Sequence, residues 1–379
     1  MKPVFKLLRA GSLLVAAVLI TGYLSAETAP SSLREFSKTI NKQFNMSGNG
    51  LVNLTNKHGK IDIKTWDQSA VRISVKIIVE AKSEEDAQEV FDRIDVGFSN
   101  SSERVSAQTE IADRKSSWWD WGGSSDKFSI NYEVYMPASA NLEVGAKYCD
   151  VYAAAIAGRG EFTVKYGNFK LDGLGEDSDI TLAYGNGTLV RARDLNVDLA
   201  YGNLDVQEAS DVNIEVRYGK LMVERAGDII SDSRYSNFRL GEIREFRNDG
   251  KYDNVEIAFA EEVVCETHYT NVYVERLARR MSLDMAYGSA KTNQIESSFD
   301  EITLNGRYTD FKLYMAPNSN CSLDLSGSYA DIRLPSSGVK TNYDAQNGNS
   351  HEVRGTMGNG GSSTIKARMS YGGILVSRN

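Results

Sequence analysis

The residues best placed to do chemistry are six acids that recur at nearly constant intervals, each three residues before a tyrosine. They are Asp198, Glu215, Asp232, Asp249, Glu266 and Asp284. On successive strands of a sheet these carboxylates would lie about 4.8 Å apart, and Ca²⁺ favours several carboxylate oxygens. The column directly before each tyrosine is basic in places: Ala200, Arg217, Arg234, Lys251, His268 and Ala286. We therefore favour mutual neutralisation on a solvated face over a cation or ligand site.

A second candidate binding site is the segment SSWWDWGGSSDKFS, in which Trp118, Trp119 and Trp121 crowd a polar loop. Exposed tryptophan can stack on sugars or lie at a membrane interface. The alternative is that the three rings close over the end of the fold as part of a cap. We favour the cap and keep a ligand contact as the second hypothesis.

The signals for an enzyme are weak. His58, His268 and His351 are scattered, no Ser-His-Asp or metal-ligand spacing is present, and the carboxylates form rows instead of an isolated pair. We therefore predict no catalytic residue, no metal site and no cofactor. Because polysaccharide-cleaving enzymes also use parallel β-helices, the fold by itself leaves catalysis open.

The elements that must position these side chains are set by a tyrosine repeat. Tyrosines recur every 17 or 18 residues over most of the run, usually followed by Gly and then Asn or Asp. Their positions are 148, 166, 184, 201, 218, 235, 252, 269, 287, 308 and 329, with a twelfth at 371. Apolar residues alternate on both sides, as in Val197 and Leu199 before Tyr201, and Leu204 and Val206 after it.

The parity of this alternation shifts by one across Gly-Asn, so that pair should form a corner. Gly and Asn adopt positive φ most easily, and we assign the bend to them. We expect tyrosine rings to fill the core, one above another, and asparagine amides to link successive corners. Two short strands and two corners per repeat fit one coil of a parallel β-solenoid.

The solenoid needs a cap at each end to cover its open strand edges. Residues 51–63 carry the same signature with His58 in the tyrosine place. A helix should follow Ser83, with Asp86 completing a capping box and one apolar face, Ala87, Val90, Phe91 and Ile94. We predict an N-terminal sheet-and-helix unit over 27–140 and repeats over 141–379. A flexible polar loop is expected at about 336–362, followed by a last coil.

The bulk composition fits an exported protein that does not bind nucleic acid. Residues 1–26 combine Lys2, Lys6 and Arg9 with an apolar run and a small-residue site, which predicts a signal peptide. An uncleaved anchor is the alternative. The formal net charge of −8 argues against a nucleic-acid surface. Cys149, Cys265 and Cys321 fall on coils too distant to pair, so free thiols are expected.

The pattern resembles a bacterial putative-adhesin domain family of unknown function, allied to the GIN-type head domains of autotransporter adhesins. The resemblance rests on LVNLTNKHGKIDIKTWDQSAVRISVKIIVEA, the helix after it, FSINYEVYMPASANLEV and the coils that follow, over about residues 36–379. It implies a right-handed parallel β-helix on an exported envelope protein and brings no catalytic residues.

From the sequence we therefore expect a non-catalytic, adhesin-like scaffold in the periplasm, on the outer-membrane surface or outside the cell. Its partner would be a cell-surface glycan or an envelope protein, and self-association is possible in principle. The alternative is a lectin or polysaccharide-active β-helix protein that uses Trp118, Trp119 and Trp121.

Overall fold

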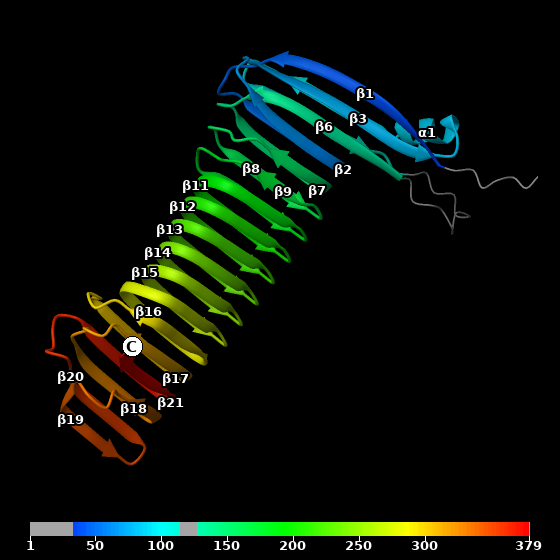
Figure 1. Cartoon of the computed structure of the whole chain (residues 1–379). Coiled ribbons are helices and arrows are strands. Elements are labelled where there is room, and N and C mark those ends of the chain that lie inside the picture. The colour runs from blue at the N-terminus through cyan, green and yellow to red at the C-terminus, as the bar shows by residue number, and fades with distance from the viewer. Residues whose placement is uncertain (1–32, 114–126, 379) are drawn as a thin grey trace, which may run out of the picture.

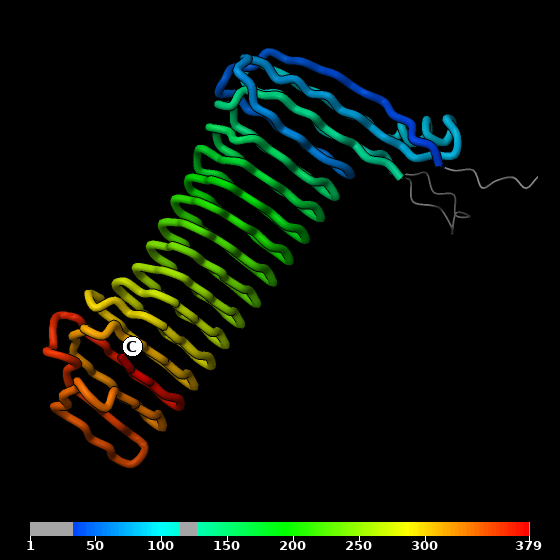
Figure 2. Tube along the Cα trace, in the orientation of Figure 1, coloured from blue at the N-terminus to red at the C-terminus, as the bar shows by residue number. Residues whose placement is uncertain are grey.

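The chain folds into a long stack of β-coils closed by a sheet-and-helix unit at one end and a hairpin at the other (Figure 1, Figure 2). The computed structural model describes residues 33–113 and 127–378. Its twenty-one strands are joined into one sheet, and the described residues contain one short helix. The predicted all-β class and the repeat of about 17 residues are confirmed. The expected signal peptide lies outside the described residues.

The N-terminal unit contains seven elements. They are β1 (Arg34–Asn45), β2 (Leu51–Trp66), β3 (Ala70–Ala81), α1 (Glu84–Phe91), β4 (Ile94–Asn100), β5 (Arg104–Ile111) and β6 (Lys127–Pro137). Strand β3 pairs antiparallel with β1 and with β6, whereas β2 runs parallel to β6 and to the following strand β7 (Asn141–Ala153). This unit therefore covers the open strand edges at the start of the stack, as a cap must.

Helix α1 begins as the sequence predicts. The Asp86 amide donates to Ser83 Oγ at 3.1 Å and the Ser83 amide donates to Asp86 Oδ2 at 3.2 Å, which completes the capping box. Ala87, Val90 and Phe91 are buried. The predicted apolar face thus packs on the cap.

The coils follow as β7 to β18. Their bounds are β7 (Asn141–Ala153), β8 (Gly160–Lys165), β9 (Phe169–Leu171), β10 (Ser178–Ala183), β11 (Asn186–Ala200), β12 (Asn203–Arg217), β13 (Lys220–Arg234), β14 (Asn237–Lys251), β15 (Asn254–His268), β16 (Asn271–Ile295), β17 (Glu301–Met315) and β18 (Cys321–Arg333). From β11 to β17 each strand pairs parallel with the next, and the register shifts only near Ala260 in β15 and near Thr292 in β16.

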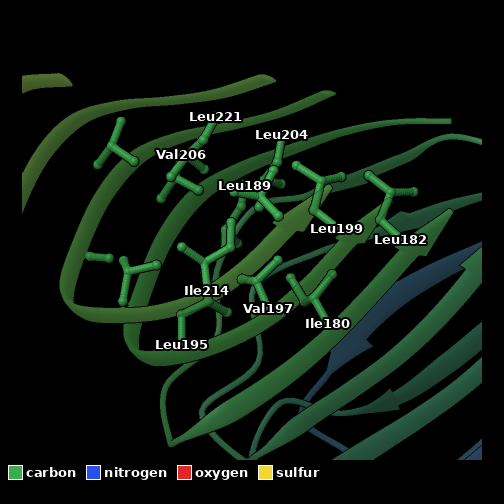
Figure 3. Close-up of a cluster of buried hydrophobic side chains, with 14 of the residues drawn as sticks. Ile180, Leu182, Leu189, Leu195, Val197, Leu199, Leu204, Val206, Ile214 and Leu221 are labelled. Carbon is green, nitrogen blue, oxygen red and sulfur yellow. The ribbon is translucent and has the colours of Figure 1, made fainter. Parts of the chain in front are cut away.

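The core lies inside these coils and is built from aliphatic columns (Figure 3). Leu199, Leu204 and Val206 are fully buried, as their alternation predicts. Leu204 stacks on Leu221 in the next coil, and Leu199 on Val216. Each such side chain contributes about 1.5–3 kcal/mol by burial, so the repeat is held together mainly by its inward aliphatic residues.

The predicted place of the tyrosines was wrong. Tyr201 is 50% exposed, and all twelve repeat tyrosines are exposed. The residue with positive φ is the tyrosine itself: Tyr201 has φ 54°, His58 has φ 61°, and the other repeat tyrosines lie between 51° and 61°. A left-handed residue breaks the alternation at its own position, so the ring turns outward and the next residue turns inward. The parity shift was real, but we assigned it to the wrong residue.

Glycine follows tyrosine because neighbouring coils approach closely at this corner. A Cβ on Gly185 would lie 1.8 Å from the carbonyl oxygen of Gly167 in the preceding coil. In later coils the inward place is taken by small or polar side chains, which are buried: Ser236, Asp253 and Thr270. Gly185 is therefore required by space, whereas the corners of later coils leave room for a small or polar side chain.

The C-terminal segment also differs from the prediction. The expected flexible loop forms an antiparallel hairpin, β19 (Val339–Asn347) and β20 (Ser350–Met357). Strand β20 pairs antiparallel with β18, so the polar segment extends the sheet and covers its end. The last strand, β21 (Thr364–Arg378), is not a terminal coil, because it pairs parallel with both β17 and β18 and lies between them (Figure 1).

The three cysteines are free and buried, as predicted. Burial raises the pKa of the Cys149 and Cys265 thiols to about 12 and that of Cys321 to about 11. Among the described residues, no helix is long and apolar enough to cross a membrane.

Candidate functional site

One edge of the solenoid carries a continuous stack of aromatic rings, which we call the tyrosine ladder. It runs through His58 and Tyr148, then Tyr166, Tyr184, Tyr201, Tyr218, Tyr235, Tyr252, Tyr269, Tyr287, Tyr308, Tyr371 and Tyr329. Neighbouring tyrosine centroids are 4.7–5.0 Å apart. Because each ring covers the face of the next, the ladder presents ring edges and hydroxyl groups to solvent.

A row of amides runs beside the tyrosine ladder, as the sequence predicts. Asn186 Nδ2 donates to Asn168 Oδ1 at 3.0 Å, and Asn203 Nδ2 donates to Asn186 Oδ1 at 2.7 Å. Asp150 Oδ1 accepts from Asn168 Nδ2 at 3.1 Å and extends the row toward the cap. These bonds link successive corners, like the amide ladders of cross-β stacks.

The six predicted acids do lie in one column on an exposed face. Asp198 is in register with Glu215, and the pairing continues through Asp232, Asp249, Glu266 and Asp284. Of these acids, Glu215 has an ion pair, with Arg217 at 2.8 Å. The described residues hold no His, Cys, Asp and Glu cluster arranged to bind a metal ion. Mutual neutralisation is thus seen at Glu215 alone.

A second acidic column was missed, although its members are spaced by 17 residues. It contains Asp177, Asp194, Asp211, Asp228, Glu245 and Glu262. Partial desolvation, followed by the hydrogen bond and charge of Asp177, raises the pKa of Asp194. Farther along, arginines balance the column: Arg244 lies 2.5 Å from Asp228. Counting acids at a fixed interval from each other, and not only from tyrosine, would have found this column.

His58 and His351 lie in different parts of the structure, the first in the tyrosine ladder and the second in the C-terminal hairpin. Burial, and then the charges of Lys57 and Lys147, lowers the pKa of His58, which stacks on Tyr148 at 5.2 Å. His58 is therefore a corner residue, as predicted. His351 Nε2 lies 3.0 Å from Asp344 Oδ1 on the neighbouring strand of the C-terminal hairpin.

One carboxylate is buried inside the coils, that of Asp253. It accepts hydrogen bonds from Ser233 Oγ at 2.8 Å and from the Ser236 amide at 2.8 Å. Burial is the main cause that raises the pKa of Asp253. The group is 4% exposed, so it is out of reach of a substrate and belongs to the packing of the coil.

The tryptophan segment lies outside the described residues, so Trp118, Trp119 and Trp121 have no place in this geometry.

Comparisons with known proteins find similarity in structure only. No protein-family model matches the sequence, and no curated protein matches it. A putative cell adhesion protein from Clostridium sporogenes is similar at 10% identity, over 91% of this chain and 100% of its own, with a TM-score of 0.19. Putative adhesins from Parabacteroides distasonis and Parabacteroides merdae are similar at 10% and 9% identity.

The P. distasonis match covers 89% of this chain and 97% of the other chain with a TM-score of 0.26. The P. merdae match covers 90% and 96% with a TM-score of 0.27. The similarity to solved putative adhesins thus extends over most of the chain. At these TM-scores it supports no inference about what the chain binds.

Proposed function

We propose that the chain is an exported, non-catalytic, adhesin-like scaffold of the bacterial envelope, wound as a right-handed β-helix, whose tyrosine ladder contacts a partner. The observation that carries this proposal is the exposure of twelve stacked tyrosines along one edge. A contiguous exposed aromatic surface of this length usually marks an interaction site, because surfaces without a binding role rarely expose one. The partner would be a cell-surface glycan or an envelope protein.

Stability alone gives little reason for tyrosine at the corner. A left-handed conformation costs an ordinary residue about 1–2 kcal/mol, while an aromatic pair contributes about 0.5–1.5 kcal/mol. These two terms nearly cancel. Asparagine or glycine would adopt the same φ at lower cost. The repeated choice of tyrosine is therefore explained better by the edge and hydroxyl groups that it presents.

The stacked geometry also restricts how a partner can bind. Sugars usually pack on the face of an aromatic ring, but in the ladder the faces are occupied by neighbouring rings. A partner would therefore meet hydroxyl groups and ring edges spaced by 4.7–5.0 Å. The second candidate, a lectin or polysaccharide-active protein using Trp118, Trp119 and Trp121, needs free ring faces.

A binding test distinguishes these candidates. The purified chain without residues 1–26 would be assayed on immobilised glycans and on intact bacterial cells. In the test variant Tyr201, Tyr218 and Tyr235 are replaced by Asn, which tolerates positive φ. The matched control is Tyr152→Asn, because Tyr152 is 45% exposed on a regular strand outside the ladder. We expect loss of binding in the triple variant only.

Two other results would point to a function other than the proposed scaffold. Binding that survives the triple variant but is lost when the three tryptophans are replaced by Ala would identify a lectin. Turnover of any polysaccharide would show an enzyme and overturn the scaffold proposal. Cell fractionation followed by surface proteolysis tests export and the final compartment.

A further inference from the structure

A groove of about 460 Å³ lies on the outer face of the solenoid near its C-terminal end. It crosses β15, β16, β17, β21, β18 and β20. In the column directly before tyrosine, earlier coils carry long side chains such as Arg217 and Lys251. In the groove the same column holds Arg307, with Ala286 on one side and Ser370 and then Ser328 on the other, so small side chains leave the face hollow around this arginine.

The groove is lined by two parallel rows of polar residues. One row runs Asp284, Asn305, Arg368, Ser326 and Glu352, each in register with the next. In the other row Arg307 lies in register with Ser370, followed by Ser328 and Ser350. The insertion of β21 between β17 and β18 places Arg368 beside the Arg307 strand, although 61 residues separate them in sequence.

The two arginines differ from most others on the surface because they have no partner. Among the described residues, Arg234, Arg307 and Arg368 are the arginines without an ion pair, a side-chain hydrogen bond or a ring contact. Two of these three lie in the groove. A guanidinium presents a planar fork of donors that matches a carboxylate.

We infer that this groove binds a linear glycan that carries carboxylate groups. Arg307 and Arg368 would receive carboxylates, and the serine hydroxyls and the Asn305 amide would bond to sugar hydroxyls. Asp284 and Glu352 accept hydrogen bonds from hydroxyls. Six strands at about 4.8 Å per step span roughly 24 Å, long enough for several sugar units in a row.

The charge and polarity of the lining exclude other ligand classes. Two arginines are matched by two acids, so the groove has no net positive charge to hold polyphosphate, which has no hydroxyl groups along its chain to donate to Asp284 and Glu352, whereas a sugar acid has both carboxylates and hydroxyls. The lining has no large exposed apolar side chain to hold an acyl chain or an amphipathic peptide. The inference goes beyond the proposed function, because this surface is distinct from the tyrosine ladder and uses different groups.

The test measures binding of a galacturonate hexamer by isothermal titration calorimetry. The same hexamer with its carboxylates methyl-esterified and inorganic polyphosphate are the comparison probes. We expect Arg307→Gln with Arg368→Gln to weaken binding of the free hexamer at least tenfold, since each lost charged hydrogen bond is worth about that factor. The matched control, Arg234→Gln, removes the third unpartnered arginine, in the same column but outside the groove, and should bind like the wild type.

Each other outcome is decisive. No detectable binding of the free hexamer overturns the inference, as does unchanged binding in a double variant whose melting curve matches the wild type. Equal binding of the esterified hexamer shows that carboxylates are not recognised, and tighter binding of polyphosphate shows a general anion surface. Should the double variant melt early, the two single variants replace it. None of these results depends on the tyrosine ladder, so the proposed function is tested separately.

Discussion

Tyr235 and Tyr252 lie on successive coils with ring centroids 4.7 Å apart and an interplanar angle of 0°. Both have a left-handed backbone, with φ 54° and 61°. The stack and the strained corner are therefore one feature: the conformation that turns the ring out of the core is also the one that sets it parallel to its neighbour. This coupling makes the corner sensitive to the shape of its side chain.

We expect Tyr235→Val to destabilise the chain by about 2 kcal/mol or more, since a β-branched residue is a poor fit to positive φ and both stacking contacts are lost. Tyr235→Asn should remain within about 1 kcal/mol of the wild type, because asparagine tolerates this conformation. The midpoint of urea unfolding measures both.

The control for this pair is Tyr152→Val. Tyr152 is similarly exposed but lies in a regular strand, where valine is favoured. A cost at Tyr152 as large as that at Tyr235 would show that exposed aromatic area, and not the left-handed corner, decides the effect.

The amide row should contribute measurably to stability at Asn186, which bonds to both neighbouring coils. Asn186→Ala removes these two side-chain bonds and is expected to cost about 1–2 kcal/mol. Asn237 stands in the same column and has no side-chain bond among the described residues, so Asn237→Ala should cost less. Equal melting temperatures for the two variants would mean that the exposed amide bonds are exchanged for water without loss.

The inward columns could be predicted from the sequence because burial enforces them. Leu199 and Leu204 alternate with charged residues, and no other arrangement hides them. The outward direction of the Tyr201 side chain could not be predicted in this way. One left-handed residue reverses which neighbouring side chains point inward and which point outward, and tyrosine rarely adopts that conformation.

The position of the last strand was equally hidden. All coils share one hydrophobic pattern, so nothing in the residues of β21 distinguishes a place after β18 from a place between β17 and β18. The groove depends on that order, because it brings Arg368 next to the strand of Arg307. The column of six acids that begins with Asp198 and Glu215, by contrast, could be predicted directly from the regular spacing of its members.

The repeat pattern and the structure make opposite predictions at Gly187. Its column continues as Leu204 and Leu221, so the pattern favours leucine at this position. In the structure the Phe169 ring of the preceding coil fills the space, and a Cβ on Gly187 would lie 2.2 Å from that ring. We expect Gly187→Leu to destabilise by about 1–3 kcal/mol through overpacking.

The matched variant combines Gly187→Leu with Phe169→Leu, which frees the space and should recover most of the lost stability. Thermal unfolding of the two single variants and the double variant gives the coupling between the sites. Additive effects would contradict the assignment of the space to the Phe169 ring.

In the column of six acids that runs from Asp198 to Asp284, neighbouring carboxylates without a basic partner should repel one another mildly. Replacing Asp232 and Asp249 together by Asn removes two like charges on adjacent strands and is expected to raise stability by about 0.5 kcal/mol at low salt. Glu215→Gln should not do so, because Glu215 is paired with Arg217. Melting temperatures at low and high NaCl measure the effect. A rise in the wild-type melting temperature with Ca²⁺, absent in the double variant, would instead show that the column binds cations.

The buried carboxylate of Asp253 should make stability depend on pH. Burial raises its pKa in the folded chain above the unfolded value, so the folded state holds the proton more tightly. Stability from this group is therefore greatest below the unfolded pKa and falls as pH rises through the folded pKa.

An asparagine in place of Asp253 is neutral at every pH, and it could still accept from the Ser236 amide and donate to Ser233 Oγ. We expect Asp253→Asn to raise the melting temperature by a few degrees at pH 7 and to match the wild type near pH 3. The exposed Asp310, changed to Asn, controls for the loss of one negative charge. A variant less stable than the wild type at pH 7 would show that the hydrogen bonds from Ser233 and Ser236 to the ionised carboxylate outweigh its desolvation.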